Sequence, residues 1–272
     1  MPRKFNLTNK NGEVYDLNLV GHAFYNPDGL GWAEETSVVR LGESWLVTDN
    51  RVAKPSVDGE IVFHGYQEYN DFLRFVQLGG LTLGYMPLST WRYLNCTIQL
   101  SKSEIKPFSK LLICPVVFNG TSQWYERATL QPSAGTIPSN AKLYDYPYPY
   151  AYAQGEAGSI TINNGVLSSY FRLQMNGLVE NPVWRLYVNG EVVHSGKVNA
   201  TISLGHSFVV NTRPTQMEIA EYDGDGNLYR DLYGYSDFST ERLFMIPAGE
   251  SMFTVADDNG TPDAYVEVYR RV

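Results

Sequence analysis

Four histidines are the residues best suited to acid–base or metal chemistry, and they lie far apart in the sequence. They are His22, His64, His194 and His206. No two stand at the HxH or HxxxH spacing that places two imidazoles on one metal ion. Each is therefore interpreted as a surface residue or a hydrogen-bonded core residue, and we expect no metal site.

Nucleophilic and hydrolytic chemistry is not indicated by the other polar residues. The sequence contains no GxSxG elbow, no Walker loop and no GxGxxG motif after a strand. Ser89 and Ser122 have no neighbouring base in the sequence that would activate a hydroxyl nucleophile. A glycosidase needs two carboxylates across a cleft, but among 29 acidic residues such pairs are uninformative. We predict that the chain is not an enzyme and has no cofactor.

One acidic segment, residues 223–227 (DGDGN), resembles the start of a calcium-binding loop. The EF-hand pattern requires glycine at its sixth position and glutamate at its twelfth, and here those positions hold Leu228 and Gly234. We favour a hairpin turn between a strand that ends at residue 222 and one that begins at residue 228. Residues 257–260 (DDNG) are likewise interpreted as a turn.

Cys96 and Cys114 both lie in apolar segments that resemble strands. Two cysteines are too few for a disulfide framework, and their separation does not fit the usual zinc spacings. We expect two buried thiols, which is the common state of cysteine in such surroundings.

Several aromatic residues have two open interpretations. Trp91, Trp124, Tyr125 and Trp184 have rings that could stack on a sugar. Residues of this kind are more often core residues or anchors of a protein interface. Sugar binding by the second half of the chain is an alternative that would require exposed aromatic rings on one face.

The elements that would position these residues are mostly short β-strands. Clusters of Gly, Asn, Asp and Pro separate segments of alternating or β-branched residues. These segments are 14–20, 38–41, 59–63, 81–85, 92–100, 111–118, 158–162, 171–175, 184–188, 198–204, 207–211, 217–222, 242–246, 251–256 and 264–269. Asn189-Gly190 is the strongest hairpin signal, because both central residues of a type I′ turn need positive φ. Residues 163–165 (NNG) are interpreted similarly.

One segment follows a helical period instead. Tyr69, Phe72, Leu73 and Val76 stand at the i, i+3, i+4, i+7 spacing of one helical face. The glycines at 79–80 supply the stop signal. The sequence predicts one helix in the first half, covering a sheet face, and no helix in the second half.

The boundary between two domains is placed within residues 131–140, which are rich in Pro, Gly and Ser and lack periodicity. A length of 272 residues favours two domains. We expect an N-terminal domain at residues 1–133 and a C-terminal domain at residues 134–272. The Tyr-Pro alternation at 144–152 is interpreted as an edge strand or extended arm.

Composition excludes some classes of partner. The formal net charge is −8 and the basic residues are scattered, so we expect no nucleic-acid binding. No segment approaches the ~20 apolar residues that span a bilayer, and we expect no signal peptide and no membrane contact. Charged residues reach only 18%, while tyrosines number 20. This pattern is typical of surfaces buried between subunits and equally of a β-protein rich in strand-forming residues.

The first half contains an ordered series of short motifs, at Asp16, Leu17, Asn18, Phe24, 27–31, 59–63, Tyr66, Tyr69, Phe72, Phe75, Leu81, Leu83, Tyr85, Pro87, Tyr93, 102–104, 112–118, Trp124 and Tyr125. The order of these motifs resembles the distal tail protein family of siphophages that infect Gram-positive bacteria. The second half is similar to the C-terminal domain of the same family at 162–165, Gly177, 181–184, Asn189, Gly190 and 265–272. No single motif is specific, whereas the series in this order is.

The resemblance implies a mainly β fold, in which an N-terminal β-sandwich with one α-helix precedes a C-terminal galectin-like or carbohydrate-binding-module-like β-sandwich. It also implies that the N-terminal domain, residues 1–133, forms a ring, usually of six subunits, between the tail tube and the tail tip. The implied partners are other copies of the chain, the major tail tube protein, the tape-measure protein, a tail-associated lysin or tail fibre and, in some relatives, receptor-binding proteins. A chain of 272 residues has no space for the large inserted sugar-binding modules of some relatives.

The loop at residues 26–32 is the candidate contact with the ring or the tube, because it is apolar, rich in glycine and ends in a tryptophan. The candidate residues are Asn26, Pro27, Gly29, Leu30, Gly31 and Trp32. The alternative is a loop that folds back on its own core. We hypothesise a structural hub of the phage tail tip, and the alternative function is a carbohydrate-binding module for the bacterial surface.

Overall fold

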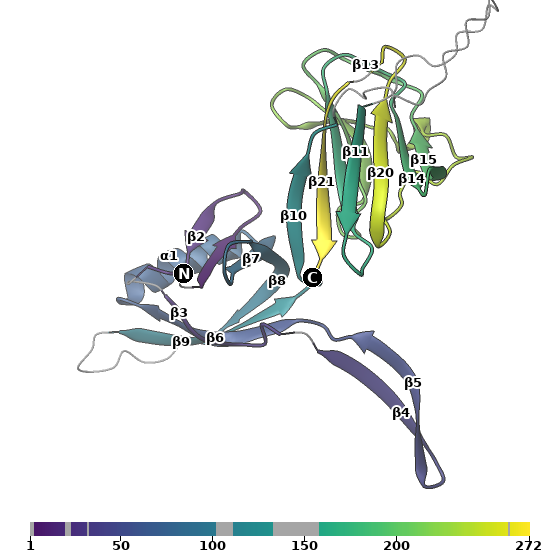
Figure 1. Ribbon diagram of the computed structural model, residues 1–272. Coiled ribbons are helices and arrows are strands. Elements are labelled where there is room, and N and C mark those ends of the chain that lie inside the picture. The colour runs from purple at the N-terminus through teal and green to yellow at the C-terminus, as the bar shows by residue number, and fades with distance from the viewer. Residues whose placement is uncertain (1–2, 20–22, 32, 102–110, 133–157, 261) are drawn as a thin grey trace, which may run out of the picture. The chain divides into compact units, whose positions relative to one another are not determined.

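The computed structural model describes residues 3–19, 23–31, 33–101, 111–132, 158–260 and 262–272 (Figure 1). The chain folds as two compact units, Met1–Glu126 with Val272 as unit 1 and Arg127–Arg271 as unit 2. The expected boundary between residues 133 and 134 lies outside the described residues. Most of the described chain is β-strand in both units, which confirms the mainly β fold class.

Unit 1 consists of antiparallel strands and one helix. Its elements are β1 (Lys4–Thr8), β2 (Val14–Asp16), β3 (Phe24–Asp28), β4 (Glu34–Leu41), β5 (Ser44–Val52), β6 (Ser56–Phe63), α1 (Tyr66–Gln77), β7 (Leu81–Met86), β8 (Arg92–Leu100), β9 (Leu112–Gly120) and the start of β10 (Tyr125–Leu130). The strands of the body pair in the order β2-β1-β7-β8-β9-β6-β3. Phe5 of β1 and Phe24 of β3 lie near opposite ends of this order, yet their ring centroids are 5.1 Å apart. The sheet therefore closes over a single apolar core as a sandwich.

The helix expected in the first half is confirmed as α1. Tyr69 and Phe72 are buried in the core of unit 1, on the face that the spacing predicted. Ahead of the first turn, the backbone N–H of His64 donates to Glu68 Oε2 at 2.8 Å. Gly79 follows the helix with a φ of 75°, the left-handed conformation that ends helices.

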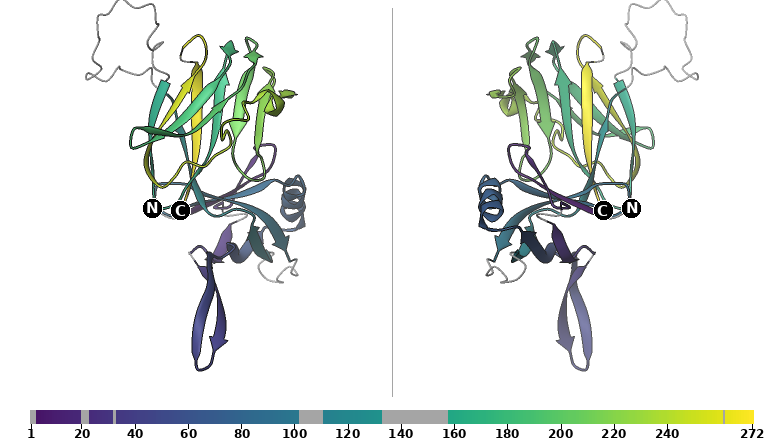
Figure 2. Two further views of the ribbon diagram at one scale, coloured as in Figure 1. Left: turned by 90° about the vertical axis from the view of Figure 1, so that its right-hand side faces the viewer. Right: turned by 90° about the vertical axis from the view of Figure 1, so that its left-hand side faces the viewer.

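Unit 2 is a two-sheet sandwich (Figure 2). Its elements are β11 (Gly158–Asn164), β12 (Tyr170–Asn176), β13 (Val179–Glu180), β14 (Val183–Val188), β15 (Glu191–Lys197), β16 (Thr201–Ile202), β17 (Ser207–Asn211), β18 (Glu218–Tyr222), β19 (Leu228–Asp231), the short 3-10 helix η1 (Tyr233–Tyr235), β20 (Gly249–Ala256) and β21 (Asp263–Arg271). One sheet has the order β19-β18-β17-β12-β21, and the second has the order β11-β20-β14-β15.

The core of unit 2 lies between these two sheets. Trp184 and Phe253 point inward from the four-stranded sheet, and Phe171 and Phe208 point inward from the other sheet. The ring centroids of Phe171 and Phe253 are 5.1 Å apart, and those of Trp184 and Phe208 are 5.8 Å apart. Full burial of such side chains stabilises a fold by about 1.5–3 kcal/mol each. Because strand residues alternate, this packing also decides which side chains of β14 and β20 face outward.

Two turns predicted for unit 2 are confirmed. Asn189 and Gly190 have φ values of 53° and 85° and connect β14 to β15. At the DGDGN segment, the backbone N–H groups of Asp225 and Asn227 donate to Asp223 Oδ1 at 3.0 and 2.8 Å. This segment is therefore the hairpin turn between β18 and β19.

Two other expectations for unit 2 are wrong. Residues 163–165 do not connect a hairpin, because β11 pairs with β20 whereas β12 pairs with β17 and β21. Residues 242–246 do not form a strand, and only Ile246 makes an isolated bridge, to Ser169. The alternation at 242–246 arises because Phe244 and Ile246 are buried in the core from an extended loop.

Candidate functional site

The expected contact loop begins inside a strand. Asn26 and Pro27 belong to β3, where a bulge interrupts the pairing with β6. Asn26 has a φ of 48° and Gly29 a φ of 78°. A Cβ atom at Gly29 would collide with the carbonyl oxygen of Ser56. The bulge and the glycine together hold the loop close to β6.

The loop lines a groove of about 650 Å³ within unit 1, formed by residues 27–31 together with residues 52–56, which run from the end of β5 to the start of β6. Tyr85 and Trp124 also line it, and both contribute to the packing around the core of unit 1. The groove thus lies where the body of unit 1 continues into β4 and β5.

The side chains of the loop divide between the core and the surface. Leu30 packs against the core of unit 1, which agrees with the alternative that the loop folds back on its own core. Asn26, Gly29 and Gly31 are exposed. Trp32 lies outside the described residues, and a contact role for the loop stays a prediction.

A two-stranded arm, made of β4 and β5, follows this loop directly (Figure 1). The two strands pair only with each other, and all of their residues are exposed. The views in Figures 1 and 2 show the arm leaving the rest of unit 1. A hairpin without further strands or a covering element is marginally stable in water. The arm is therefore the part of unit 1 that most needs a partner surface.

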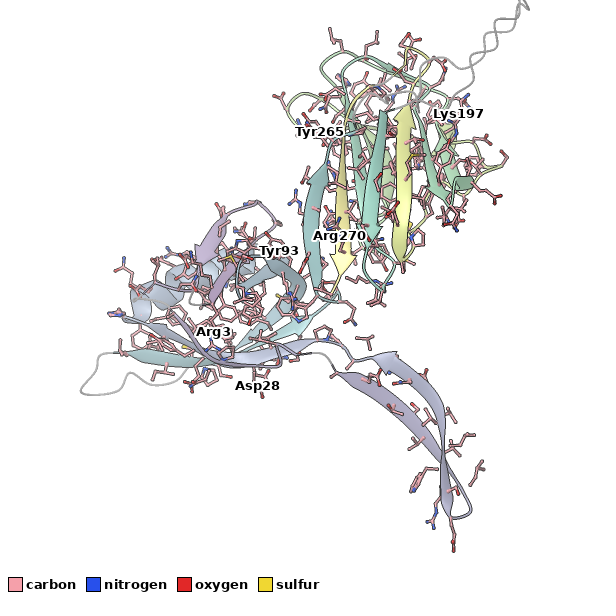
Figure 3. All side chains as sticks on the ribbon, viewed as in Figure 1. Arg3, Asp28, Tyr93, Lys197, Tyr265 and Arg270 are labelled. Atoms are coloured by element: carbon pink, nitrogen blue, oxygen red, sulfur yellow. The ribbon has the colours of Figure 1, made fainter. Side chains whose placement is uncertain are left out.

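Apolar side chains occupy both faces of the arm. Val38 pairs with Val47, and Val39 pairs with Leu46. Because neighbouring strand residues point to opposite faces, these two pairs lie on opposite faces. The exposed fractions of these side chains are 48%, 57%, 49% and 52%, and Trp45 is 66% exposed. Figure 3 shows the arm's side chains standing out from the ribbon without other elements around them. Exposed apolar side chains that gather on one element are typical of interaction sites.

The base of the arm carries polar pairs across the strands. Arg51 forms an ion pair with Glu35 at 2.9 Å, and Asn50 Nδ2 donates to Glu34 Oε2 at 3.0 Å. The side chains of Arg51 and Glu35 are 70% and 50% exposed, so this pair contributes little to stability. These contacts help to set the register of the hairpin, and the apolar positions supply the surface that a partner would bury.

Most of the aromatic residues considered for sugar stacking are core residues. Trp124, Tyr125 and Trp184 are 7%, 9% and 0% exposed. All three are therefore buried, which confirms the core interpretation for them, and Trp124 also lines the groove of unit 1. Trp91 is half-buried, and its ring stacks 6.4 Å from that of Tyr93.

Both cysteines are buried, as predicted. Burial raises the pKa of the Cys96 thiol to about 12, which keeps it protonated near neutral pH. A protonated buried thiol is a poor nucleophile and a poor metal ligand.

Two of the histidines have a glutamate partner each. His194 Nδ1 lies 2.8 Å from Glu241 Oε2, and His206 Nδ1 lies 2.7 Å from Glu221 Oε1. His22 lies outside the described residues. Within the described ranges, no three His, Cys, Asp or Glu side chains come together as a set of metal ligands. In the same ranges, no helix is long and apolar enough to cross a bilayer.

Residues 4–121, which include the body of unit 1 and the arm, match the family model described as the N-terminal domain of distal tail proteins. This part of the chain is therefore similar to the domain found at the N-terminus of distal tail proteins. A comparison with curated protein sequences found no match.

Solved structures of phage proteins share the fold of both units. A chain from the phage P2 baseplate in its activated conformation with Ca superposes with a TM-score of 0.70 at 16% identity, covering 100% of this chain and 99% of that chain. SPP1 Dit (gp 19.1), described as a hub of the adsorption apparatus in phages that infect Gram-positive bacteria, has a TM-score of 0.58 at 10% identity, covering 98% of each chain. At such identities the likeness establishes the fold alone.

Proposed function

We propose that this chain is a distal tail protein, a structural component of the phage virion, and that it self-associates into a ring of six subunits that joins the tail tube to the tail-tip apparatus. The match of residues 4–121 to the N-terminal domain of distal tail proteins supports a structural role at the tail tip. The observation that carries the ring is the arm, which is exposed along its full length and apolar on both faces.

The physical argument starts from the symmetry of rings. Neighbouring subunits of a ring are related by a rotation and meet head to tail, so each subunit uses two different surface patches, one for each neighbour. The arm is one such patch, and it would dock on the body of the next subunit. The candidate loop contributes to the same contact region through Asn26, Pro27, Gly29, Leu30, Gly31 and Trp32.

The remaining partners follow from the position of such a ring. Its two faces would meet the tube protein and the tape-measure protein on one side and a tail-associated lysin, tail fibre or receptor-binding protein on the other. Buried apolar and aromatic contacts would supply the affinity, and charged rims would steer the order of assembly. The ring would form in the host cytoplasm and turn over no substrate.

The test is a matched pair of substitutions that each place a carboxylate at an exposed leucine. Leu46 of the arm is 52% exposed, and Leu204 of unit 2 is 82% exposed. We expect Leu46→Glu to reduce the solution mass from that of a ring toward that of one chain, because it buries a charge in the proposed contact. Leu204→Glu should leave the mass unchanged.

Light scattering after size-exclusion chromatography measures both variants beside the parent chain. Circular dichroism spectra should be the same for all three, because neither leucine belongs to a core. A ring that persists in Leu46→Glu would contradict the role of the arm, as would equal dissociation of both variants.

A further inference from the structure

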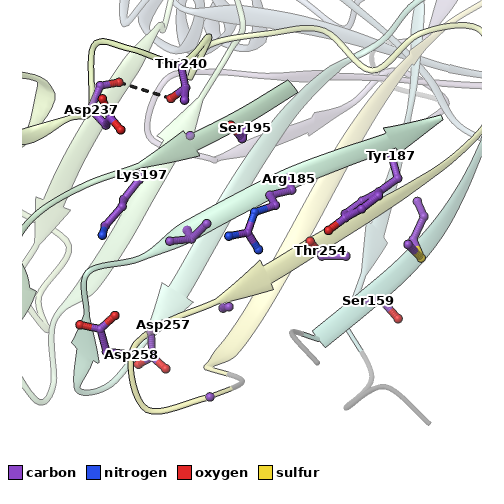
Figure 4. Close-up of a pocket in the computed structure, with 15 residues that line it drawn as sticks. Ser159, Arg185, Tyr187, Ser195, Lys197, Asp237, Thr240, Thr254, Asp257 and Asp258 are labelled. Carbon is purple, nitrogen blue, oxygen red and sulfur yellow. Dashed lines mark hydrogen bonds between the residues drawn. The ribbon is translucent and has the colours of Figure 1, made fainter. Parts of the chain in front are cut away.

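A polar groove of about 590 Å³ lies on the outer face of the four-stranded sheet of unit 2 (Figure 4). Ser159, Thr254, Arg185 and Ser195 form one row across β11, β20, β14 and β15, because the strand register pairs each residue with the next. The row faces away from the core, since the alternate residues of β14, such as Trp184, point inward.

The row has an aromatic side and a charged side. Tyr187 follows Arg185 by two positions on β14 and therefore lies on the same face. Lys197 lies on the other side of the row, two positions after Ser195 on β15. Figure 4 shows Tyr187, Arg185 and Lys197 spread along the face, with Asp237 and Asp257 near the Lys197 end.

The polar side chains of the row make no hydrogen bonds with other described residues. Within the part of the chain that the structure describes, Arg185 makes neither a hydrogen bond nor an ion pair, although its side chain is half-buried. The hydroxyl groups of Ser159, Thr254 and Ser195 are equally without hydrogen bonds there. A half-buried guanidinium among unused hydroxyls is expected to bind a ligand or water, because unpaired polar groups are costly.

The acceptor at the charged end is well defined. The hydroxyl and the backbone N–H of Ser239 donate to Asp237 Oδ1 at 2.7 and 2.9 Å. These hydrogen bonds hold the pKa of Asp237 below its usual value, so this carboxylate stays ionised at neutral pH. The groove therefore offers a permanent acceptor opposite the donors of Arg185 and Lys197.

The chemistry of the lining selects a class of ligand. Arg and Lys only donate, carboxylates only accept, and Ser and Thr hydroxyls do both. The two cations face three carboxylates, Asp237, Asp257 and Asp258, so the groove has no positive excess that would favour a phosphate or carboxylate ligand. A neutral ligand rich in hydroxyl groups uses all of these partners at once. The ring of Tyr187 adds an apolar surface for the C–H face of a pyranose.

We propose that this groove binds a neutral saccharide, whose hydroxyls contact Arg185, the serine and threonine row and Asp237, and whose ring lies against Tyr187. The volume falls in the range of about 300–1,000 Å³ that is usual for small-ligand sites. The site does not depend on the proposed ring, because all of its residues belong to unit 2 of one chain.

The test uses the whole chain and an array of neutral and anionic saccharides, followed by titration calorimetry with the neutral saccharides that bind. Arg185→Gln removes the central donor of the row, and Arg172→Gln on β12 of the other sheet is the matched control. We expect the chain to bind neutral saccharides, and Arg185→Gln to weaken that binding about tenfold or more, the loss expected for a charged hydrogen bond. Arg172→Gln should leave it unchanged.

Three results would overturn the proposal. The first is no binding of any saccharide at millimolar concentration. The second is binding of anionic saccharides alone, which would mean that the groove selects charge. The third is binding of a neutral saccharide that Arg185→Gln does not weaken, which would place the site elsewhere. Equal unfolding temperatures of the two variants would show that any loss of binding is not a loss of fold.

Discussion

At the residue scale, unit 2 contains a carboxylate that is fully enclosed by its partners. The side chain of Glu221 on β18 is 0% exposed. Arg230 Nε donates to Oε2 at 2.5 Å, His206 Nδ1 lies 2.7 Å from Oε1, and the backbone N–H of Ser203 donates to Oε1 at 3.4 Å. A buried carboxylate is tolerated only when it is paired and hydrogen-bonded in this way. The network ties β18 to β19 and to the segment before β17.

Replacing the enclosed carboxylate should destabilise unit 2 strongly. Glu221→Gln keeps the size of the side chain but leaves Arg230 without its counter-charge and turns an amide donor toward other donors. We expect the free energy of unfolding to fall by about 3 kcal/mol, as measured by urea unfolding followed by circular dichroism.

The matched control is Glu241→Gln, because Glu241 also pairs with a histidine but its side chain is 63% exposed. An exposed pair of this kind contributes little, so the change should stay within about 0.5 kcal/mol. Similar losses in both variants would show that the enclosure of Glu221 has no special energetic role.

At the scale of elements, β15 approaches β14 so closely that one position requires glycine. A Cβ atom at Gly196 would overlap the indole ring of Trp184, the largest fully buried side chain of unit 2. Neither residue can move freely, because Trp184 Nε1 also donates to the carbonyl oxygen of Arg242 at 3.1 Å. The packing of the four-stranded sheet therefore depends on this contact.

Gly196→Ala should destabilise unit 2 by about 1–3 kcal/mol, the usual effect of overfilling a packed core. Differential scanning calorimetry should show a fall of at least about 3 °C in its unfolding temperature. Gly234→Ala is the control, because nothing lies within 4 Å of an added Cβ there and its φ is not positive. An unchanged unfolding temperature in Gly196→Ala would contradict the observed contact.

The elements that could be predicted from the sequence are those that local rules decide. The helix α1 follows from the spacing of Tyr69 and Phe72, and the β14–β15 hairpin follows from the need for positive φ at Asn189 and Gly190. Residues 242–246 misled the prediction, because an extended loop buries alternate side chains as a strand does.

The arm and the groove were beyond such local rules. Only residues 38–41 of the arm were expected to be a strand. The arm buries none of its side chains within its own chain, so its sequence lacks the alternation of apolar and polar residues that predicts a half-buried strand. Its signal is the pair of apolar runs, 38–39 and 45–47, on either side of Gly42 with its φ of 65°. The row through Arg185 depends on the register of strands that are distant in sequence, which alternation within one strand does not reveal.

At the scale of the whole molecule, two compact units carry different kinds of surface. Unit 1 presents an apolar arm suited to contact with protein, and unit 2 presents a polar groove suited to a small hydroxylated ligand. The low content of charged residues, 18% of the chain, agrees with surfaces that become buried on assembly. Self-association through the arm is the central claim, since it makes the chain a hub.

The most direct test is the solution mass of the purified chain, measured by light scattering after size-exclusion chromatography over a range of concentrations. A ring of six subunits predicts a mass near six times the 30.7 kDa of one chain. This mass should not change on dilution as long as the protein concentration stays well above the dissociation constant of the ring. A mass of 30.7 kDa at every concentration would contradict a hub that assembles through its own arm.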